Sequence, residues 1–280
     1  MDSLPQNLLI WIGGLGDGLM TVPYPPLLAR ALPESWSLAQ TLLSSSYGGW
    51  GTSSLKLDAI ELHQCVKYFR GVKSGKIVLM GHSTGCQDVM EYLVGPGHDD
   101  RPPIDGAILQ APVSDREASL MHMPHDQYTK SVAAAQTMVS EGNADEILPT
   151  SVTHGFFGAP VTARRWLSLL SPNHDGEDDY FSSDLPDTQL NRTFGMLPAH
   201  TPLCILYSGA DEHVPPEIDK MALVSKWINI AQRHGKVDTE YSGVIDGASH
   251  NLKQDSADVV AELGRRVIGF LSGLRSSALL

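Results

Sequence analysis

The chain is short of cysteine and of long apolar runs, and both shortages narrow its class. It has 3 cysteines in 280 residues, and Cys65, Cys86 and Cys204 all lie within apolar helix or strand patterns. We interpret them as reduced core residues, because three cysteines cannot all pair with one another. No stretch approaches the roughly 18 consecutive apolar residues of a membrane span, and the start has neither a basic segment nor a cleavage site. We therefore expect a soluble, cytoplasmic protein without a membrane partner.

Positive charge is also scarce, with 20 Lys and Arg against 32 Asp and Glu and a net charge of -12. This balance argues against nucleic acid as a partner, because a phosphate backbone is bound mainly by Lys and Arg. The 11 histidines show no His-Glu-x-x-His or comparable spacing, so we predict no metal site and no cofactor. Gly14-Leu15-Gly16 resembles part of a dinucleotide fingerprint, but Leu19 stands where its third glycine is required.

The most informative segment is an apolar strand that runs into a serine between two glycines. Residues 77–86 read Ile-Val-Leu-Met-Gly-His-Ser-Thr-Gly-Cys, and an apolar pattern with helical spacing follows. A serine hydroxyl is a poor nucleophile, so it must be presented on a tight turn where a histidine can reach it. Gly81 and Gly85 permit such a turn because they lack a Cβ atom. The pattern indicates a nucleophile elbow and predicts Ser83 as the nucleophile.

A triad of this kind follows the chain order nucleophile, acid, histidine. An apolar strand is expected at 203–207, and Asp211 follows it at the edge of the sheet. A last strand is expected at 240–245, and His250 lies between it and a closing amphipathic helix. We therefore predict Asp211 as the acid and His250 as the general base.

Two other carboxylates compete with Asp211 for the role of acid. Glu212 is its neighbour, and Asp246 lies only four residues before His250. The position of Asp246 suits a residue that stabilises the loop better than one that orients the histidine ring.

The developing oxyanion of an acyl transfer needs preorganised hydrogen-bond donors. An apolar strand at 8–12 is followed by Gly-Gly-Leu-Gly-Asp-Gly at 13–18, in the first strand-to-helix loop, where hydrolases keep such a donor. We predict the backbone amides of Leu15 and Thr84 as the two donors.

The order of elements predicts an α/β fold with a mostly parallel sheet between layers of helices. We expect strands at 8–12, 37–43, 76–80, 107–111, 203–207 and 240–245. Because the first begins almost at Met1, the antiparallel strands that often precede it in hydrolases are expected to be absent or trimmed.

About ninety residues separate the fourth and fifth strands, far more than a simple crossover needs. We predict a helical lid at 113–201, inserted into a core made of 1–112 and 202–280. Helices are expected around 131–140 and at 163–170, the latter behind Thr162 as N-cap, and an acidic loop at 171–187. The segment carries 12 Asp and Glu against 5 Lys and Arg. Its charge indicates either an ordinary solvated surface or an electrostatic funnel for a cationic substrate.

Four segments together resemble the α/β-hydrolase superfamily, and within it a fungal branch of intracellular siderophore esterases. They are 13–18, Gly-His-Ser-Thr-Gly-Cys-Gln-Asp at 81–88, Ala-Pro-Val-Ser-Asp-Arg-Glu at 111–117 and Ser-Gly-Ala-Asp-Glu-His-Val-Pro-Pro at 208–216. The resemblance implies ester hydrolysis of fusarinine-type hydroxamate siderophores, with iron release and with Ser83, Asp211 and His250 as the triad. It also implies that fusarinine C, with free amino groups, is cationic, whereas its acetylated relative is not.

Three functional hypotheses follow. The leading one is a serine esterase that hydrolyses fusarinine-type siderophores, with or without iron, through an acyl-enzyme. The second is a cytosolic serine hydrolase of another small ester, a thioester or a peptide. The third is a hydrolase-fold binding protein without turnover. The sequence leaves the exact substrate and the oligomeric state open.

Overall fold

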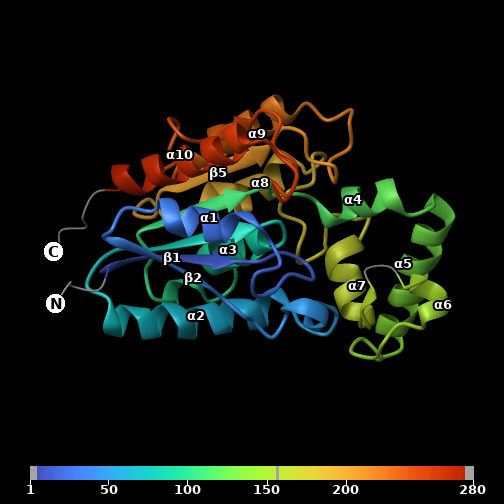
Figure 1. Cartoon of the computed structure of the whole chain (residues 1–280). Coiled ribbons are helices and arrows are strands. Elements are labelled where there is room, and N and C mark those ends of the chain that lie inside the picture. Colours follow the sequence, from blue (N-terminus) through green and yellow to red (C-terminus); the bar gives the residue numbers. More distant parts are fainter. Residues whose placement is uncertain (1–4, 156–157, 275–280) are drawn as a thin grey trace.

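Six parallel strands form the centre of the molecule in the residues that the computed structural model describes, 5–155 and 158–274. The strand order is β2-β1-β3-β4-β5-β6, and every neighbouring pair is parallel (Figure 1). The strands are β1 (Asn7–Ile12), β2 (Trp36–Gln40), β3 (Ile77–His82), β4 (Gly106–Gln110), β5 (Leu203–Ser208) and β6 (Gly243–Ile245). The parallel α/β architecture expected from the sequence is confirmed.

The apolar strands are continuous because both faces of the sheet are covered by helices. Leu9 and Trp11 of β1 point to the face covered by α1 (Tyr24–Ala31) and α10 (Ala257–Gly273), whereas Ile10 points to the opposite face. That second face is covered by α2 (Leu55–Val72), α3 (Gly85–Val94) and α9 (Lys220–Ala231). Parallel strands all end at the same edge, so the loops that follow β1, β3, β5 and β6 meet there.

Both edge strands are shorter than the sequence patterns predicted. The expected strand at 37–43 ends at Gln40, and the expected strand at 240–245 begins only at Gly243. An edge strand pairs on one side only, so fewer hydrogen bonds hold its ends in the ladder. Before β6 the chain instead forms a turn, in which the Tyr241 amide donates to Oδ1 of Asp238 at 2.8 Å.

The segment inserted between β4 and β5 is mainly helical. It contains α4 (Asp115–His122), α5 (His125–Ser140), α6 (Thr150–Thr153), α7 (Ala163–Leu170), α8 (Asp187–Arg192) and the 3-10 helix η4 (Phe194–Met196). Two other 3-10 helices, η1 (Tyr47–Gly51) and η2 (His98–Asp100), precede β4. Figure 1 shows α4 to α7 gathered at the end of the molecule opposite the two termini. Thr162 caps α7, as expected, by accepting a hydrogen bond from the Arg165 amide at 3.1 Å. None of the helices in the described ranges is both long and apolar enough to cross a membrane.

The inserted segment, residues 113–201, packs in two parts. Helices α5 and α7 share an apolar cluster centred on the buried Trp166, to which η1 contributes Trp50. Tyr180 and Phe181, farther along the chain, instead join the large cluster beneath the sheet. Only the first part therefore has a core of its own, separate from the core of the sheet.

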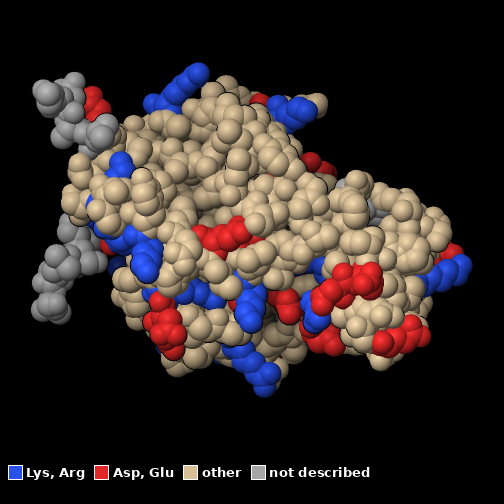
Figure 2. Space-filling view, turned by 90° about the horizontal axis from the view of Figure 1, so that it is seen from below, with Lys and Arg blue, Asp and Glu red and all other residues tan. Residues whose placement is uncertain are grey.

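The acidic loop is partly buried, which the sequence did not predict. Asp178 and Asp179 are 3% and 9% exposed. Asp178 pairs with Arg165 at 2.5 Å, and Asp179 lies 3.5 Å from Arg116. The two carboxylates are therefore neither part of a solvated surface nor able to attract a cationic substrate through solvent. On the face shown in Figure 2, the end of the molecule formed by α4 to α7 presents several Asp and Glu side chains together with a few Lys and Arg.

Candidate active site

The turn after β3 places Ser83 in a strained backbone conformation. Its φ is 54°, in the left-handed region that residues with a side chain rarely adopt. A Cβ atom on Gly85 would lie 2.5 Å from the Ile12 carbonyl oxygen, and one on Gly81 would collide with the Gly85 carbonyl. Strand, turn and helix can pack this closely only because both positions are glycine. The strain lifts the Ser83 hydroxyl out of the strand, as a nucleophile elbow requires.

The structure brings the three residues of the predicted triad together. Oγ of Ser83 lies 2.8 Å from Nε2 of His250, and Nδ1 of the same ring lies 2.8 Å from Oδ2 of Asp211. Asp211 follows β5 and His250 follows β6, so the ends of neighbouring parallel strands deliver both side chains to the Ser83 turn. The geometry is an unbroken chain of hydrogen bonds from carboxylate to imidazole to hydroxyl.

The carboxylate of Asp211 fixes which nitrogen of His250 carries a proton. Burial would raise the pKa of Asp211, but hydrogen bonds from His250 and from the His213 amide lower it below its usual value. An ionised carboxylate can only accept, so Nδ1 of His250 is the donor in that bond. In the neutral ring Nε2 is then free to accept the proton of Ser83.

The two rival acids occupy different positions. Oε2 of Glu212 accepts a hydrogen bond from the backbone amide of His250 at 2.9 Å, so it holds the loop and does not contact the ring. Asp246 is exposed and follows the last residue of β6. Of the three carboxylates, Asp211 is the one hydrogen-bonded to the imidazole.

The glycine-rich loop after β1 passes directly over Ser83. A Cβ atom on Gly14 would lie 2.5 Å from the Cβ of Ser83. Asp17 closes this loop, since its Oδ2 accepts from the Gly14 amide at 2.9 Å. Within the described part of the chain, the amides of Leu15 and Thr84 donate to no other protein group. Both are therefore available beside the hydroxyl, and their role as oxyanion donors stays a prediction.

Sequence reasoning missed a buried polar hub behind the triad. Oε1 of Gln110 lies 2.6 Å from Nδ1 of His82 and accepts from the Tyr24 hydroxyl at 2.8 Å. The His82 ring stacks on Trp11 and lies 5.0 Å from the His250 ring. Burial and the neighbouring His250 lower the pKa of His82 to about 4, so it is neutral at physiological pH. A glutamine at the end of an apolar strand was the one available signal.

A second histidine contacts the other side of the site. The half-buried ring of His213 packs edge-on against His250 with 4.7 Å between centroids, and His122 of α4 packs against His213 at 5.6 Å. Burial and the adjacent His250 lower the pKa of His213. The inserted segment thus reaches the loop that carries Asp211 through a contact between two imidazoles.

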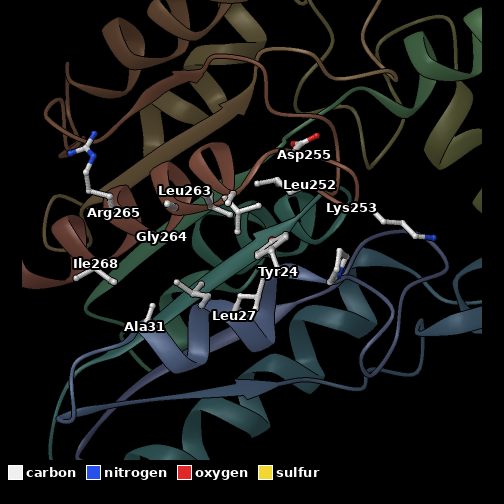
Figure 3. A pocket seen from close by; sticks show the side chains of 15 residues that line it. Tyr24, Leu27, Ala31, Leu252, Lys253, Asp255, Leu263, Gly264, Arg265 and Ile268 are labelled. Atoms are coloured by element: carbon white, nitrogen blue, oxygen red, sulfur yellow. The ribbon is translucent and has the colours of Figure 1, made fainter.

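A separate apolar cleft of about 690 Å³ lies between α1 and α10 (Figure 3). Leu27 and Leu263 are among its walls, and Leu252 and Lys253 come from the loop that carries His250. None of the three triad residues lines it, so this cleft is distinct from the site at Ser83. Within the described ranges, no group of three or more His, Cys, Asp or Glu side chains is placed to hold a metal ion.

The parallel sheet and the positions of the three side chains define an α/β-hydrolase fold. A solved structure titled "Alpha/Beta hydrolase fold protein of unknown function" has a TM-score of 0.61 at 18% identity, covering 95% of this chain and 87% of that chain. At this identity the likeness shows the fold alone.

Closer relatives give the family. The chain belongs to the family described as "Protein of unknown function (DUF1749)", which matches residues 1–272. "Fusarinine C esterase sidJ" of Aspergillus fumigatus is 41% identical over 96% of this chain and 90% of the relative. The solved structure of "Siderophore hydrolase EstB from Aspergillus fumigatus" is 40% identical and has a TM-score of 0.85. The match covers 98% of this chain and 92% of that chain. The expected resemblance to fungal siderophore esterases is confirmed.

Proposed function

We propose that this protein is a serine esterase that hydrolyses ester bonds of fusarinine-type hydroxamate siderophores. The observation that carries the chemistry is the hydrogen-bond chain from Asp211 through His250 to Ser83, with both distances at 2.8 Å. The substrate class is supported by relatives of about 40% identity named as a fusarinine C esterase and a siderophore hydrolase. We further infer that the protein acts in the cytoplasm, where its three free cysteines would stay reduced.

In the proposed acylation step, Oγ of Ser83 attacks the ester carbonyl carbon while Nε2 of His250 takes the hydroxyl proton. Asp211 holds the ring by its Nδ1 proton and stabilises the imidazolium that forms. The amides of Leu15 and Thr84 stabilise the negative charge that develops on the carbonyl oxygen. His250 then donates its proton to the leaving alcohol, and the acyl group remains on Ser83.

Deacylation would repeat these steps with water as the nucleophile. His250 removes a proton from the water, the oxyanion forms against the same two amides, and Ser83 leaves as the protonated alcohol. The products are a carboxylic acid and the alcohol released earlier. Opening successive esters of a cyclic siderophore in this way would weaken its hold on iron.

We also propose that the inserted segment, residues 113–201, acts as a cap over the site. Two contacts support this role: His122 packs on His213 beside the catalytic ring, and the Thr162 amide donates to the Gly51 carbonyl at 2.9 Å. Helices α5 and α7 share an apolar cluster that is separate from the two clusters of the sheet and that anchors them to the core through Trp50.

The direct test is product analysis with purified enzyme and fusarinine C, with and without iron. Wild type should give linear hydroxamate fragments that gain one water for each ester opened, as measured by mass spectrometry. Ser83→Ala should give none and should not react with a fluorophosphonate probe, while its circular dichroism stays that of wild type. Ser272→Ala is a matched control, because Ser272 is exposed on α10 and does not line the cavity at the site, and it should keep both activities.

Three results would separate the alternatives. Probe labelling without siderophore cleavage would favour a hydrolase of another small ester, a thioester or a peptide, to be identified by substrate screening. Labelling of a serine other than Ser83 would overturn the assigned nucleophile. No labelling and no cleavage would favour a binding protein without turnover.

A further inference from the structure

A small cavity lies beside the two amides assigned to the oxyanion. It has a volume of about 20 Å³, and its lining includes Gly14, Leu15 and Thr84. The carboxyl groups of Asp58 on α2 and Asp88 on α3 line the same cavity. A negative charge formed at Ser83 would therefore develop close to two acidic side chains in a region of low dielectric constant. Charges interact strongly in such a region, so the protonation state of the two carboxyls matters for the reaction.

Burial and the surroundings of these carboxyls indicate that they are not both ionised. Asp58 and Asp88 are 2% and 6% exposed and line one cavity, and a hydrogen bond between the two side chains contributes to the raised pKa of Asp88. Two carboxylates are both acceptors and cannot form such a bond, so at least one proton lies between them. Oδ1 of Asp88 is buried, and no N–H or hydroxyl group of a described residue donates to it. Oδ1 of Asp58 accepts from the Ser53 hydroxyl at 3.2 Å.

We propose that Asp58 and Asp88 are positioning residues that share one proton and so hold the charge beside the oxyanion site at a single negative unit. The pair acts through the amides of Leu15 and Thr84, whose attraction for the oxyanion a second negative charge would oppose. This inference rests on the proposed function, because it requires an oxyanion at Ser83.

One cation among the residues that line the cavity faces the pair, and a third carboxylate shares it, so two negative charges on the pair would be poorly compensated. Arg165 of α7 lines the same cavity, donates from Nε to the Trp50 carbonyl at 3.0 Å, and pairs with Asp178 at 2.5 Å. Burial, then the charges of Asp58 and Asp178, raise the pKa of Asp88 well above its usual value, whereas Arg165 lowers it.

The Asp58 end of the pair titrates at a lower pH. Burial raises the pKa of Asp58 to about 6, with hydrogen bonds from Ser45 and Ser53 and the charge of Arg165 lowering it and Glu61 raising it. At neutral pH the pair therefore keeps the proton of Asp88 and carries one negative charge.

The proposal predicts a loss of reactivity when the shared proton leaves. A second charge in the cavity would oppose the oxyanion and slow attack by Ser83 roughly ten- to a hundredfold. Asn at position 88 carries no charge at any pH and keeps an amide that can bond to Asp58. In Asp88→Asn only Asp58 can ionise, so the pair carries one negative charge at neutral pH and at alkaline pH alike.

The test measures how fast a fluorophosphonate probe labels Ser83 between about pH 7 and about pH 10. In wild type the rate, corrected for probe hydrolysis, should fall at the alkaline end by the factor given above. In Asp88→Asn and in Asp58→Asn this fall should be absent. Glu91→Gln is the matched control, because Glu91 is a buried carboxyl on the same helix that does not line the cavity. This control should keep the wild-type profile.

A spectroscopic measurement tests the shared proton directly. At neutral pH the infrared difference spectrum of wild type minus Asp88→Asn should contain the C=O stretch of one buried protonated carboxyl group, because Asp115, which is also protonated, contributes equally to both spectra and cancels. Its absence from the difference spectrum would overturn the proposal. An alkaline fall of equal size in wild type and in the two Asn variants would overturn it as well.

Failure of this inference can be distinguished from failure of the proposed function. If wild type is labelled at neutral pH but the variants keep its alkaline fall, only the role of the pair is wrong. If wild type is never labelled, the esterase assignment fails, and the infrared band still decides whether the proton is shared. Should Asp88→Asn not fold, Asp58→Asn decides the question alone, because with one carboxyl left the pair can never carry a second negative charge.

Discussion

Gly14 lies so close above Ser83 that the two positions cannot both carry a normally placed Cβ atom. The Cβ of an alanine at position 14 would lie 2.5 Å from Ser83 Cβ and 3.0 Å from its Oγ. Both atoms belong to Ser83, so neither can move without changing the position of the nucleophilic hydroxyl. The loop after β1 is thus held at a distance from the nucleophile that only glycine permits.

Gly14→Ala should therefore impair turnover more than substrate binding. The added methyl group would displace the loop that carries the Leu15 amide, and loss of one oxyanion donor typically lowers kcat about 10²- to 10³-fold. KM should change much less. Gly48→Ala is the control, because a Cβ there meets nothing within 4 Å. Steady-state kinetics with equal kcat values for both variants would contradict the assigned oxyanion site.

The three candidate acids should separate on substitution. Asp211→Asn should lower kcat by about 10⁴-fold, because an amide can no longer fix the Nδ1 proton of His250. Glu212→Gln should cost far less, since its side chain holds the His250 amide and not the ring. Asp246→Asn should be close to neutral. If Asp246→Asn proved the most damaging change in a kcat comparison, the assignment of Asp211 would be wrong.

The fold and the positions of the triad could be predicted because each depends on local patterns. Apolar runs predicted the four inner strands with nearly correct bounds, since a strand buried on both faces has no polar alternation. The edge strands β2 and β6 are only partly buried, and their predicted bounds were less accurate. Glycines at 81 and 85 marked the turn, and chain order then placed Asp211 and His250 after later strands. Parallel strands end at one edge, so order along the chain was enough to predict proximity in space.

Contacts between distant segments could not be predicted in this way. The pairing of Arg165 with Asp178 depends on how α7 packs against the acidic loop, and a run of carboxylates has the same sequence pattern whether solvated or buried. Gln110 binds His82 and Tyr24 across three different elements. No spacing in the sequence encodes a contact of this kind.

Asp115 should make stability fall as pH rises. Burial and the nearby charge of Asp178 raise the pKa of this carboxyl from 3.8 to about 8. Between these two values the folded protein holds a proton that the unfolded chain has lost, so the free energy of unfolding decreases with pH. The slope from one such group is at most about 1.4 kcal/mol per pH unit.

Asp115→Asn should remove this contribution while keeping an acceptor for the Gln87 amide, which now donates to Asp115 at 2.9 Å. Urea unfolding at several pH values between about 5 and about 8 should show a shallower decline than in wild type. The exposed Asp126 provides the control, since Asp126→Asn should leave the decline as it is. An unchanged slope in Asp115→Asn would mean that Asp115 is ionised in the folded protein.

The electrostatic role of the inserted segment should be tested on its solvated carboxylates only. Asp178 and Asp179 are buried beside arginines, so neutralising them would leave a buried guanidinium group unpaired and would disturb the fold. Asp175 and Glu177 are exposed and line a shallow groove beside α7. A field from exposed charges acts on encounter and is screened over about 8 Å at physiological ionic strength.

We expect the double variant Asp175→Asn, Glu177→Gln to lower kcat/KM for cationic fusarinine C by about two- to fivefold at low salt and to spare the acetylated siderophore. The difference should shrink as salt is raised, because it arises from attraction through solvent and not from a contact. Asp99→Asn, Asp100→Asn makes the same change of charge in η2, which follows the end of α3 that lies away from Ser83. This control should leave kcat/KM unchanged for both siderophores. Equal kcat/KM changes for the two siderophores, or a preference that salt does not reduce, would show that these carboxylates form an ordinary solvated surface.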